Sequence, residues 1–489
     1  MHAANSSPPR TAGRSGLRPL ESLILLLFFF SGASALVYEV VWTRDLTTVF
    51  GGSAFAIATV LAAYMAGLAL GSTVFGRSID RRGHPLVVYG LLEAGIALWA
   101  ILLPVLLGLL DRLYAGFYQS ASPGFYGLSL VRFALSFLLL LVPTTLMGGT
   151  LPVLGKLLFT NWKGLGTRAG LLYAANTLGA VLGSAAGGFF LLPAMGLRGA
   201  TWVAVLINFA VAFAALLASR RFAYRAPAAA GTEGASAAQA EAVRAPSGAA
   251  GRPKADDARL RRAVLLVYAA SGFAALAYEV AWTKTLSMVL GTTNYAFTTM
   301  LTTFLFGLAV GSLLFARLAD RYGRPEALLA LVQLGIPLFS LLTIPLLEAL
   351  PQMFVDAFPR LDGSWARIEL YRVFLAAMTM FLPTILMGGT FPLVTRAYVD
   401  RRQTGRSLGS LYAANTIGAI LGSFLTGFVL IPWIGRQNAI LAASFVNLAA
   451  GLLLVLALRG RRVPGGLRWA IAGVCLLLLP AWIWGLQRW

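Results

Sequence analysis

One stretch of this sequence occurs twice, as Ser31-Gly-Ala-Ser-Ala-Leu-Val-Tyr38-Glu39-Val-Val-Trp42-Thr43-Arg44 and as Ser271-Gly-Phe-Ala-Ala-Leu-Ala-Tyr278-Glu279-Val-Ala-Trp282-Thr283-Lys284. Both copies lie within long apolar runs, as expected for membrane-spanning helices. Around the first copy, a basic N-terminus and the small residues Ala33-Ser34-Ala35 imitate a cleaved signal peptide. Because the same run returns in the interior of the chain, we expect it to be a retained span.

The repeat extends over nearly all of each half of the chain and keeps its register. Four pairs of residues lie 240 positions apart, namely Glu39 and Glu279, Asp80 and Asp320, Arg132 and Arg372, and Gly148 and Gly388. The run Tyr173-Ala-Ala-Asn176-Thr177 returns 239 positions later as Tyr412-Ala-Ala-Asn415-Thr416. Each half is therefore expected to build the same bundle of helices.

The composition indicates a membrane protein. Hydrophobic residues make up 58% of the chain and charged residues only 12%, so a water-soluble globule could not cover its surface with polar groups. The net charge of +21 lies in short basic runs between apolar stretches, which is typical of cytoplasmic loops and argues against nucleic-acid binding. A single cysteine, Cys475, excludes an internal disulfide. With His2 and His84 as the only histidines, we expect neither a metal site nor a cofactor.

Apolar runs of about 20 residues locate the expected spans. They lie at 21–46, 52–76, 86–110, 127–157, 168–193, 198–219, 263–286, 292–316, 326–350, 367–397, 407–432 and 438–459, with a thirteenth at 469–486. The resulting parts are a cytoplasmic tail 1–19, a six-helix bundle 20–219, a flexible cytoplasmic linker 220–261, a second six-helix bundle 262–459 and an extra helix 460–489. Basic runs follow the even-numbered helices, which predicts a cytoplasmic N-terminus and two parallel repeats.

The loops after the second and eighth helices share a motif. They read Gly76-Arg77-Ser78-Ile79-Asp80-Arg81-Arg82-Gly83 and Ala316-Arg317-Leu318-Ala319-Asp320-Arg321-Tyr322-Gly323-Arg324. Both resemble the G-x-x-x-D-R-x-G-R loop signature of the major facilitator superfamily (MFS), with departures at His84 and Ala316. That superfamily also assembles its fold from parallel six-helix repeats. We therefore expect an all-α membrane protein of MFS-like fold, with two six-helix bundles and a thirteenth helix.

The motif carries a physical role of its own. A carboxylate such as that of Asp80 can sit at a helix N-terminus, where free N–H groups and the helix dipole favour an anion. The resemblance implies a latch that holds the two halves together on the cytoplasmic side, formed by Asp80, Arg81, Asp320 and Arg321. The alternative is a pair of ordinary basic turns.

Three phrases are similar to the membrane part of the fused MFS/spermidine synthase proteins. These are Tyr38-Glu39-x-x-Trp42-Thr43-Arg44, Leu146-Met-Gly-Gly-Thr-Leu-Pro152 and Tyr173-Ala-Ala-Asn176-Thr177. In that family an aminopropyltransferase domain often follows the helices, but the chain after Arg468 is too short to hold one. We expect a stand-alone or truncated member in the bacterial inner membrane, without the enzyme activity.

Two ion pairs are predicted in the outer third of the membrane. An ionisable group inside a span costs free energy and is a functional candidate by default. Glu39 and Arg132 lie at similar depths, about 10 Å from the outer end of their helices at 1.5 Å per residue. The resemblance to the MFS places their helices on the central cavity, so Glu39 with Arg132, and Glu279 with Arg372, are expected to pair on its wall. Each pair can bind substrate, or it can only staple its own bundle.

Aromatic residues accompany both glutamates. Tyr38 and Trp42 are four residues apart and share a helix face, as do Tyr278 and Trp282. With Glu39 and Glu279 they are candidates for a cage around an organic cation, for which the link to spermidine synthases favours a polyamine. The alternative is a belt of aromatic residues at the membrane interface.

Glu93 is the candidate for proton coupling. It lies near the membrane midplane, about eight residues beyond Pro85, and its repeat equivalent is the neutral Gln333. A titratable Glu93 in one half and a neutral Gln333 in the other fit a single proton-binding site. The alternative is that Glu93 only makes a hydrogen bond between helices. Asn176 and Asn415 are also predicted near the midplane, where they can bond across helices or contact substrate.

The fourth and tenth helices contain residues that break the helical pattern. These are Pro143, Gly148 and Gly149 in the first bundle and Pro383, Gly388 and Gly389 in the second. They are candidate hinges for an inner gate. The alternative is that the glycines serve close helix packing.

Three functions compete. The first is a secondary transporter that moves a small organic cation, such as a polyamine, by alternating access and with proton coupling. The second is a non-transporting membrane module that anchors or serves a soluble synthase, and the third is a lipid-handling protein. An enzyme acting alone is not expected, because the sequence has no nucleophile–base set, no metal-ligand spacing and no phosphate-binding loop.

Overall fold

Two sets of six long helices and one further helix make up the part of the chain that the structure describes. The structure is a computed structural model and describes residues 17–50, 54–80, 83–121, 125–159, 164–222, 255–291, 294–400, 403–458 and 465–486. The first set comprises α1 (Leu17–Phe50), α2 (Ala54–Ile79), α3 (Pro85–Ala121), α4 (Phe125–Leu158), α5 (Leu165–Ala185) and α6 (Leu192–Arg221). The second comprises α8 (Ala255–Leu290), α9 (Asn294–Arg321), α10 (Pro325–Ala357), α11 (Trp365–Tyr398), α12 (Thr404–Leu425) and α13 (Ile431–Ala457), and α14 (Gly465–Leu486) follows.

The chain reverses direction at one glycine in each set. Leu165–Arg221 and Thr404–Ala457 are continuous helical stretches of 57 and 54 residues, far longer than the roughly 20 residues that one span needs. Each is two spans folded at a residue with positive φ, Gly196 (66°) in the first and Gly435 (80°) in the second. Only glycine adopts this conformation without strain. Both glycines lie in the breaks that the sequence predicts.

Before each reversal the helix widens into a short π-helical segment. These segments are η1 (Ala186–Leu191) and η3 (Thr426–Leu430), and a 3-10 turn, η2 (Phe358–Leu361), lies between α10 and α11. Because η1 and η3 occupy equivalent places in the two halves, the repeat seen in the sequence extends to a local irregularity of the backbone.

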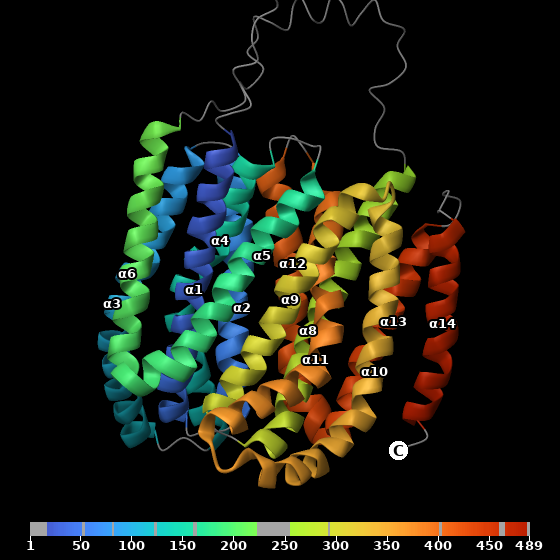
Figure 1. The fold of residues 1–489 in the computed structure, drawn as a ribbon. Coiled ribbons are helices and arrows are strands. Elements are labelled where there is room, and N and C mark those ends of the chain that lie inside the picture. Colours follow the sequence, from blue (N-terminus) through green and yellow to red (C-terminus); the bar gives the residue numbers. More distant parts are fainter. Residues whose placement is uncertain are drawn as a thin grey trace, which may run out of the picture.

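The helices stand side by side, and four of them join the two bundles (Figure 1). Across the interface α5 packs on α9, and α2 packs on α12. Both contacts join the fifth helix of one set to the second helix of the other, so they are equivalent under the repeat. Within the bundles α1 packs on α5 and α8 on α12. The thirteenth helix, α14, packs against α10 at one edge of the molecule. Its residues Ile471 and Val474 pack against the hydrophobic core of the protein.

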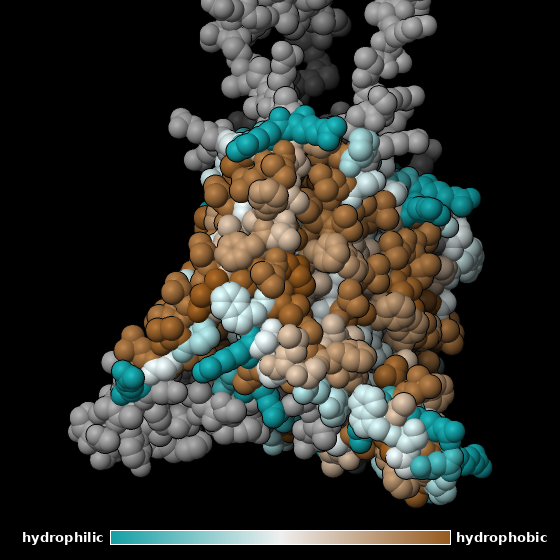
Figure 2. Space-filling view, turned by 60° about the vertical axis from the view of Figure 1, so that its left-hand side comes forward, coloured by the Kyte–Doolittle hydropathy of each residue, from teal (hydrophilic) through white to brown (hydrophobic). Residues whose placement is uncertain are grey.

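The outer surface is that of an integral membrane protein. Figure 2 shows hydrophobic side chains over the middle of the molecule, with hydrophilic side chains gathered toward its two ends. Large apolar side chains such as Leu206, Phe213 and Leu266 are exposed to the surroundings. A surface of this kind needs a lipid environment.

The predicted hinge residues lie inside uninterrupted helices. Pro143, Gly148 and Gly149 fall within α4, and Pro383, Gly388 and Gly389 fall within α11. A Cβ on Gly148 would come within 2.3 Å of the Leu68 oxygen of α2, and one on Gly388 within 2.0 Å of the Leu308 oxygen of α9. Close helix packing therefore accounts for these two glycines, and the hinge role stays a prediction.

Replacing Gly388 with Ala is expected to destabilise the protein. The added methyl group must push α11 away from the α9 backbone, and overpacking of this kind costs about 1–3 kcal/mol. The midpoint temperature of thermal unfolding in detergent should fall. Gly108→Ala is the matched control, because a Cβ at that position meets nothing within 4 Å. Equal midpoints for the two variants would show that the α9–α11 contact is not tight.

Candidate functional site

A buried carboxylate lies at the centre of the first bundle. The side chain of Glu93 on α3 is 0% exposed. Ser31 on α1 donates a hydrogen bond from its hydroxyl to Oε1 at 2.5 Å, and Asn208 on α6 donates from Nδ2 to Oε2 at 2.5 Å. Three helices thus meet on one carboxylate, and each of its oxygens has a donor.

Two tyrosines surround this carboxylate. Tyr89, one helical turn before Glu93, donates to the Leu27 carbonyl of α1 at 3.2 Å. The hydroxyl of Tyr38 on α1 is buried within electrostatic range of Glu93 and has no hydrogen-bond partner among the residues that the structure describes. Both phenols add polar atoms to a site that excludes bulk water.

The second bundle repeats this cluster without the charge. Ser271, Gln333 and Asn447 stand where the first half has Ser31, Glu93 and Asn208. Gln333 is fully buried, and neither its Oε1 nor its Nε2 has a partner within the described part of the chain. Glu93 is therefore a carboxylate with two hydrogen-bond donors, whereas Gln333 is an amide whose oxygen and nitrogen have no hydrogen-bond partner among the described residues.

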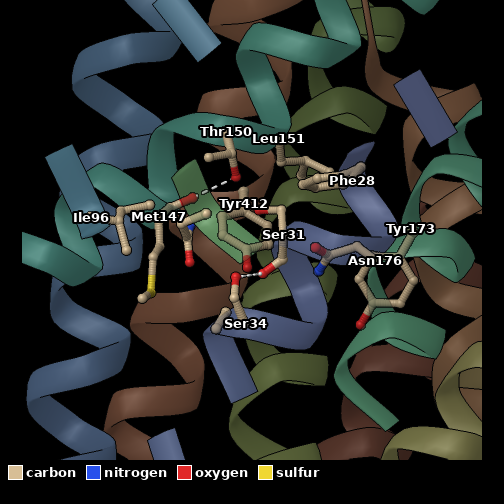
Figure 3. Close-up of a pocket in the computed structure, with 12 residues that line it drawn as sticks. Phe28, Ser31, Ser34, Ile96, Met147, Thr150, Leu151, Tyr173, Asn176 and Tyr412 are labelled. Carbon is tan, nitrogen blue, oxygen red and sulfur yellow. Dashed lines mark hydrogen bonds between the residues drawn. The ribbon is translucent and has the colours of Figure 1, made fainter. Parts of the chain in front are cut away.

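A small cavity lies beside the Glu93 cluster and reaches the interface between the bundles (Figure 3). Its volume is about 60 Å³, which is room for a few water molecules or one small polar group. Ser31 and Asn208, the two donors to Glu93, both line it. Tyr412 enters from α12 of the second bundle, opposite Tyr173 of α5. The cavity is thus the place where both bundles approach Glu93.

Glu39 and Glu279 form an acidic pair between the bundles. They lie on α1 and α8, and the Glu279 carboxyl is within electrostatic range of Glu39. Glu39 is 8% exposed, and Tyr64 and Tyr412 lie within the same electrostatic range. Neither glutamate makes an ion pair with a described basic residue. The structure brings together two residues that the sequence assigned to separate pairs.

The ion pair predicted between Glu279 and Arg372 is wrong. Arg372 instead bonds Glu369, three residues earlier on α11, with 2.5 Å between Nη1 and Oε1. An i,i+3 pair needs no second helix and forms as soon as the helix does. The other predicted pair joins Glu39 to Arg132, whose side chain lies outside the described residues.

The aromatic residues next to the glutamates face into their own bundles. Tyr38 and Trp42 stack with ring centroids 5.1 Å apart, and Tyr278 and Trp282 stack at the same distance. In the second bundle the Tyr278 hydroxyl donates to Ser444 of α13, and Trp282 donates to Thr343 of α10. All four rings are buried.

The aromatic cage predicted from these four residues is therefore wrong. Consecutive residues of a helix point about 100° apart. Tyr38 can thus turn into its bundle while Glu39 faces the interface. The aromatic residues that do accompany Glu39 are Tyr64 on α2 and Tyr412 on α12, two helices that pack on each other across the interface.

Asn176 and Asn415 lie at equivalent helix crossings. A Cβ on Gly32 of α1 would come within 2.1 Å of the Asn176 backbone oxygen, and one on Gly272 of α8 within 2.1 Å of that of Asn415. Asn176 also lines the cavity. Of the two predicted asparagines, Asn176 is thus the one that the structure places beside the Glu93 cluster.

Asp80 joins the first bundle to the second. Its carboxylate accepts hydrogen bonds from the backbone N–H groups of Gly405 (3.1 Å) and Arg406 (2.7 Å) in the first turn of α12. Lys156 from the end of α4 lies 2.5 Å away and completes the site. A carboxylate in this place satisfies N–H groups that the helix cannot pair itself.

Asp320 makes the mirror contact from the second bundle to the first. It accepts from the N–H groups of Gly166 (3.0 Å) and Thr167 (2.7 Å) in the first turn of α5. Arg396 from the end of α11 lies 3.4 Å away. The two aspartates therefore close the same end of the molecule, which we call the Asp80 end.

The basic partners of these aspartates differ from those predicted. Arg321 is exposed, and Arg81 lies outside the described residues. Lys156 and Arg396 take the role instead, from the last turns of α4 and α11. They also lie 240 positions apart, so the repeat itself was the signal that could have identified them.

Curated proteins match part of the chain, whereas no family model matches it. Polyamine aminopropyltransferase 2 of Streptomyces coelicolor is 28% identical over 204 residues, which are 40% of this chain and 34% of that protein. Polyamine aminopropyltransferase of Corynebacterium efficiens is 30% identical over 130 residues, 24% of this chain and 25% of that protein. The chain thus spans about a third or less of the length of these relatives.

Solved transporter structures share the fold. The human organic anion transporter MFSD10 aligns with a TM-score of 0.55 and 15% identity over 90% of this chain and 100% of its own. A bacterial homologue of the iron transporter ferroportin, in an outward-facing state, aligns with a TM-score of 0.57 and 18% identity over 90% and 99% of the two chains. The chain therefore shares the fold of these transporters, the MFS-like fold that the sequence predicted.

Proposed function

We propose that the chain is a secondary transporter that moves a small organic cation, such as a polyamine, across a membrane by alternating access. The observation that carries this proposal is the acidic pair between the bundles, a buried Glu39 and a half-buried Glu279. Neither makes an ion pair within the described part of the chain. Two carboxylates inside a membrane are costly unless a cation or protons balance them. A polyamine carries several positive charges and suits such a site.

The two aspartates support alternating access. At the Asp80 end each bundle holds the N-terminus of a helix of the other, through four N–H···O bonds in all. These contacts are polar and can be exchanged for water, so they suit a gate that opens and closes. We assign Asp80 and Asp320 to a latch that is closed in this structure, and we place this end and the N-terminus in the cytoplasm of a bacterium.

Glu93 supports proton coupling. It is the buried carboxylate that has no acidic counterpart in the other half, and the cavity connects its donors to the interface between the bundles. A group in this place can exchange a proton for a cation as the bundles move. The transporter would then use a proton gradient to drive the solute.

Uptake into proteoliposomes tests the proposed function. Vesicles with the purified protein and an acidic interior should accumulate labelled spermidine or 1,4-diaminobutane, and a protonophore should prevent it. Protein-free vesicles are the control. If no cation of the set enters under either direction of the pH gradient, the transport function is wrong.

The names of the curated relatives favour a second candidate. Both match this chain over a part of their length and are named for aminopropyl transfer. The chain would then anchor or serve a soluble synthase. This candidate predicts that the purified protein binds such a synthase in pull-down experiments and that proteoliposomes show no uptake.

A further inference from the structure

The cavity beside Glu93 lies where the two halves of the repeat differ. Much of its lining is the same in both halves, for example Ser31 and Ser271, or Thr150 and Thr390. Three lining positions differ between the halves, and so does Glu93 beside the cavity. The pairs are Phe28 against Tyr268, Ser34 against Ala274, Leu151 against Phe391, and Glu93 against Gln333.

Three of the four differences act in the same direction, and Phe28, which lacks the hydroxyl of Tyr268, is the exception. Ser34 adds a hydroxyl where the second half has a methyl group, and Leu151 leaves space where the second half has a phenyl ring. Indeed Phe391 fills its place by stacking on Tyr173, with ring centroids 4.8 Å apart. Glu93 adds a negative charge. The first half therefore offers room, polarity and charge together, as a site for a cation would.

One acceptor in this cavity has no partner. Asn208 is 1% exposed and lines the cavity, and its Oδ1 makes no hydrogen bond within the described part of the chain. Its Nδ2 donates to Glu93, so Oδ1 is the atom left for a ligand. A buried acceptor without a donor costs free energy, about 1–3 kcal/mol, which a bound donor restores. Because Asn208 Oδ1 lies beside the Glu93 carboxylate, a positively charged donor suits it best.

We infer that the cavity is a subsite for one protonated primary amino group, which donates to Asn208 Oδ1 and is balanced by the charge of Glu93. This inference rests on the proposed function, since the amino group would be one end of the transported cation. Tyr173 and Tyr412 supply aromatic walls, one from each bundle. The volume admits an ammonium group but not a whole polyamine, whose remainder must extend toward Glu39 and Glu279.

Asn208 links the subsite to the protonation of Glu93. An ionised carboxylate can only accept, so it holds the amide nitrogen and leaves Oδ1 to the cavity. A protonated Glu93 donates, and the amide then turns its oxygen to Glu93 and its NH2 group to the cavity. The cavity would present a donor instead of an acceptor and reject the ammonium group. Proton and amine therefore exclude each other.

The other groups that face Glu93 do not duplicate its titration. Tyr89 faces it from its own helix, and Tyr38 and Ser31 face it from α1. From α6 the neighbour is the neutral Asn208, and from α4 the cavity is lined by Met147 and Thr150, which carry no charge. A pH dependence of amine binding that disappears in Glu93→Gln is thus assigned to Glu93.

Binding of methylammonium to the purified protein tests the subsite. We expect Leu151→Phe and Ser34→Ala, which install the residues of the second half, to weaken binding at least about tenfold, because they remove space or an acceptor. Glu93→Gln should abolish binding and its pH dependence. Gln333→Glu, outside the cavity, is the control and should bind within about twofold of the wild type. Tetramethylammonium, which has no N–H donor, should not bind.

The outcomes separate the subsite from the transport function. If Leu151→Phe, Ser34→Ala and Glu93→Gln all bind methylammonium as the wild type does, or if tetramethylammonium binds equally well, the subsite is wrong even when uptake is observed. If wild-type vesicles show no uptake while the binding pattern holds, the transport function is wrong and the subsite stands. The second half already carries Phe391 and Ala274 at the equivalent helix positions, so Leu151→Phe and Ser34→Ala introduce side chains that this fold accommodates. Loss of binding in both variants would therefore not be explained by misfolding of one of them.

Discussion

Proton-driven uptake of a polyamine is expected to fall at least about a hundredfold when Glu93 is replaced by Gln. Removing one partner of a buried charge pair costs about 3–5 kcal/mol, and 1.4 kcal/mol corresponds to a factor of ten. The side chain of Gln has almost the same shape as that of Glu, so the cluster with Ser31 and Asn208 can persist. Initial rates in proteoliposomes with an imposed pH gradient measure the effect.

A double exchange provides the matched control for this variant. Glu93→Gln combined with Gln333→Glu keeps the total charge and moves the carboxyl to the second bundle, where Ser271 and Asn447 stand in place of its donors. Because the second half has Ala274 and Phe391 at the cavity positions, the double variant should remain inactive. Uptake by Glu93→Gln at the wild-type rate would remove Glu93 from the mechanism, and recovery in the double variant would show that either half can serve.

Asp80→Asn together with Asp320→Asn is expected to open the Asp80 end. Each aspartate accepts two backbone N–H groups and lies beside one basic side chain, and losing its charge costs about 2 kcal/mol. The two sites are independent, so together they should shift the equilibrium between closed and open by roughly a hundredfold to a thousandfold. States that are open at the Asp80 end would then become readily detected.

The rate of thiol labelling measures this opening. Cys475 is the single cysteine, and in a Cys475→Ser background Ser72→Cys places a thiol of nearly the same size at the interface. Ser72 is buried and contacts the Gly409 carbonyl of α12. Labelling of the Ser72→Cys thiol should accelerate in the Asp80→Asn/Asp320→Asn variant. It should not accelerate in Asp362→Asn, which removes an exposed ion pair with Arg367 away from the interface. Equal labelling rates in all three proteins would contradict the latch.

The repeat made most of the architecture predictable. Copies of the same apolar stretch located the spans, and the paired loop motifs placed Asp80 and Asp320 in equivalent positions. The contrast between Glu93 and Gln333 could also be read from the sequence, because a repeat supplies its own comparison. Each of these inferences needs only positions along the chain.

The partners of these residues could not be predicted in the same way. Asn208 is a single polar residue of an apolar helix, and its contact with Glu93 depends on how α6 is rotated against α3. The pairing of Arg372 failed for the opposite reason, since Glu369 is a local partner that an i,i+3 count would have found. Helix rotation also decided that Tyr38 and Trp42 turn away from the interface that Glu39 faces.

Release of protons on amine binding tests most directly the central claim, that a proton on Glu93 and an amino group in the cavity exclude each other. Methylammonium chloride is added to the purified protein in a weakly buffered solution, at a pH where the amine stays charged, and the pH change is recorded. The wild type should release up to about one proton for each amine bound, most at low pH, while Glu93→Gln should release none. Amine binding without any proton release from the wild type, at any pH at which the protein binds the amine, would contradict the account.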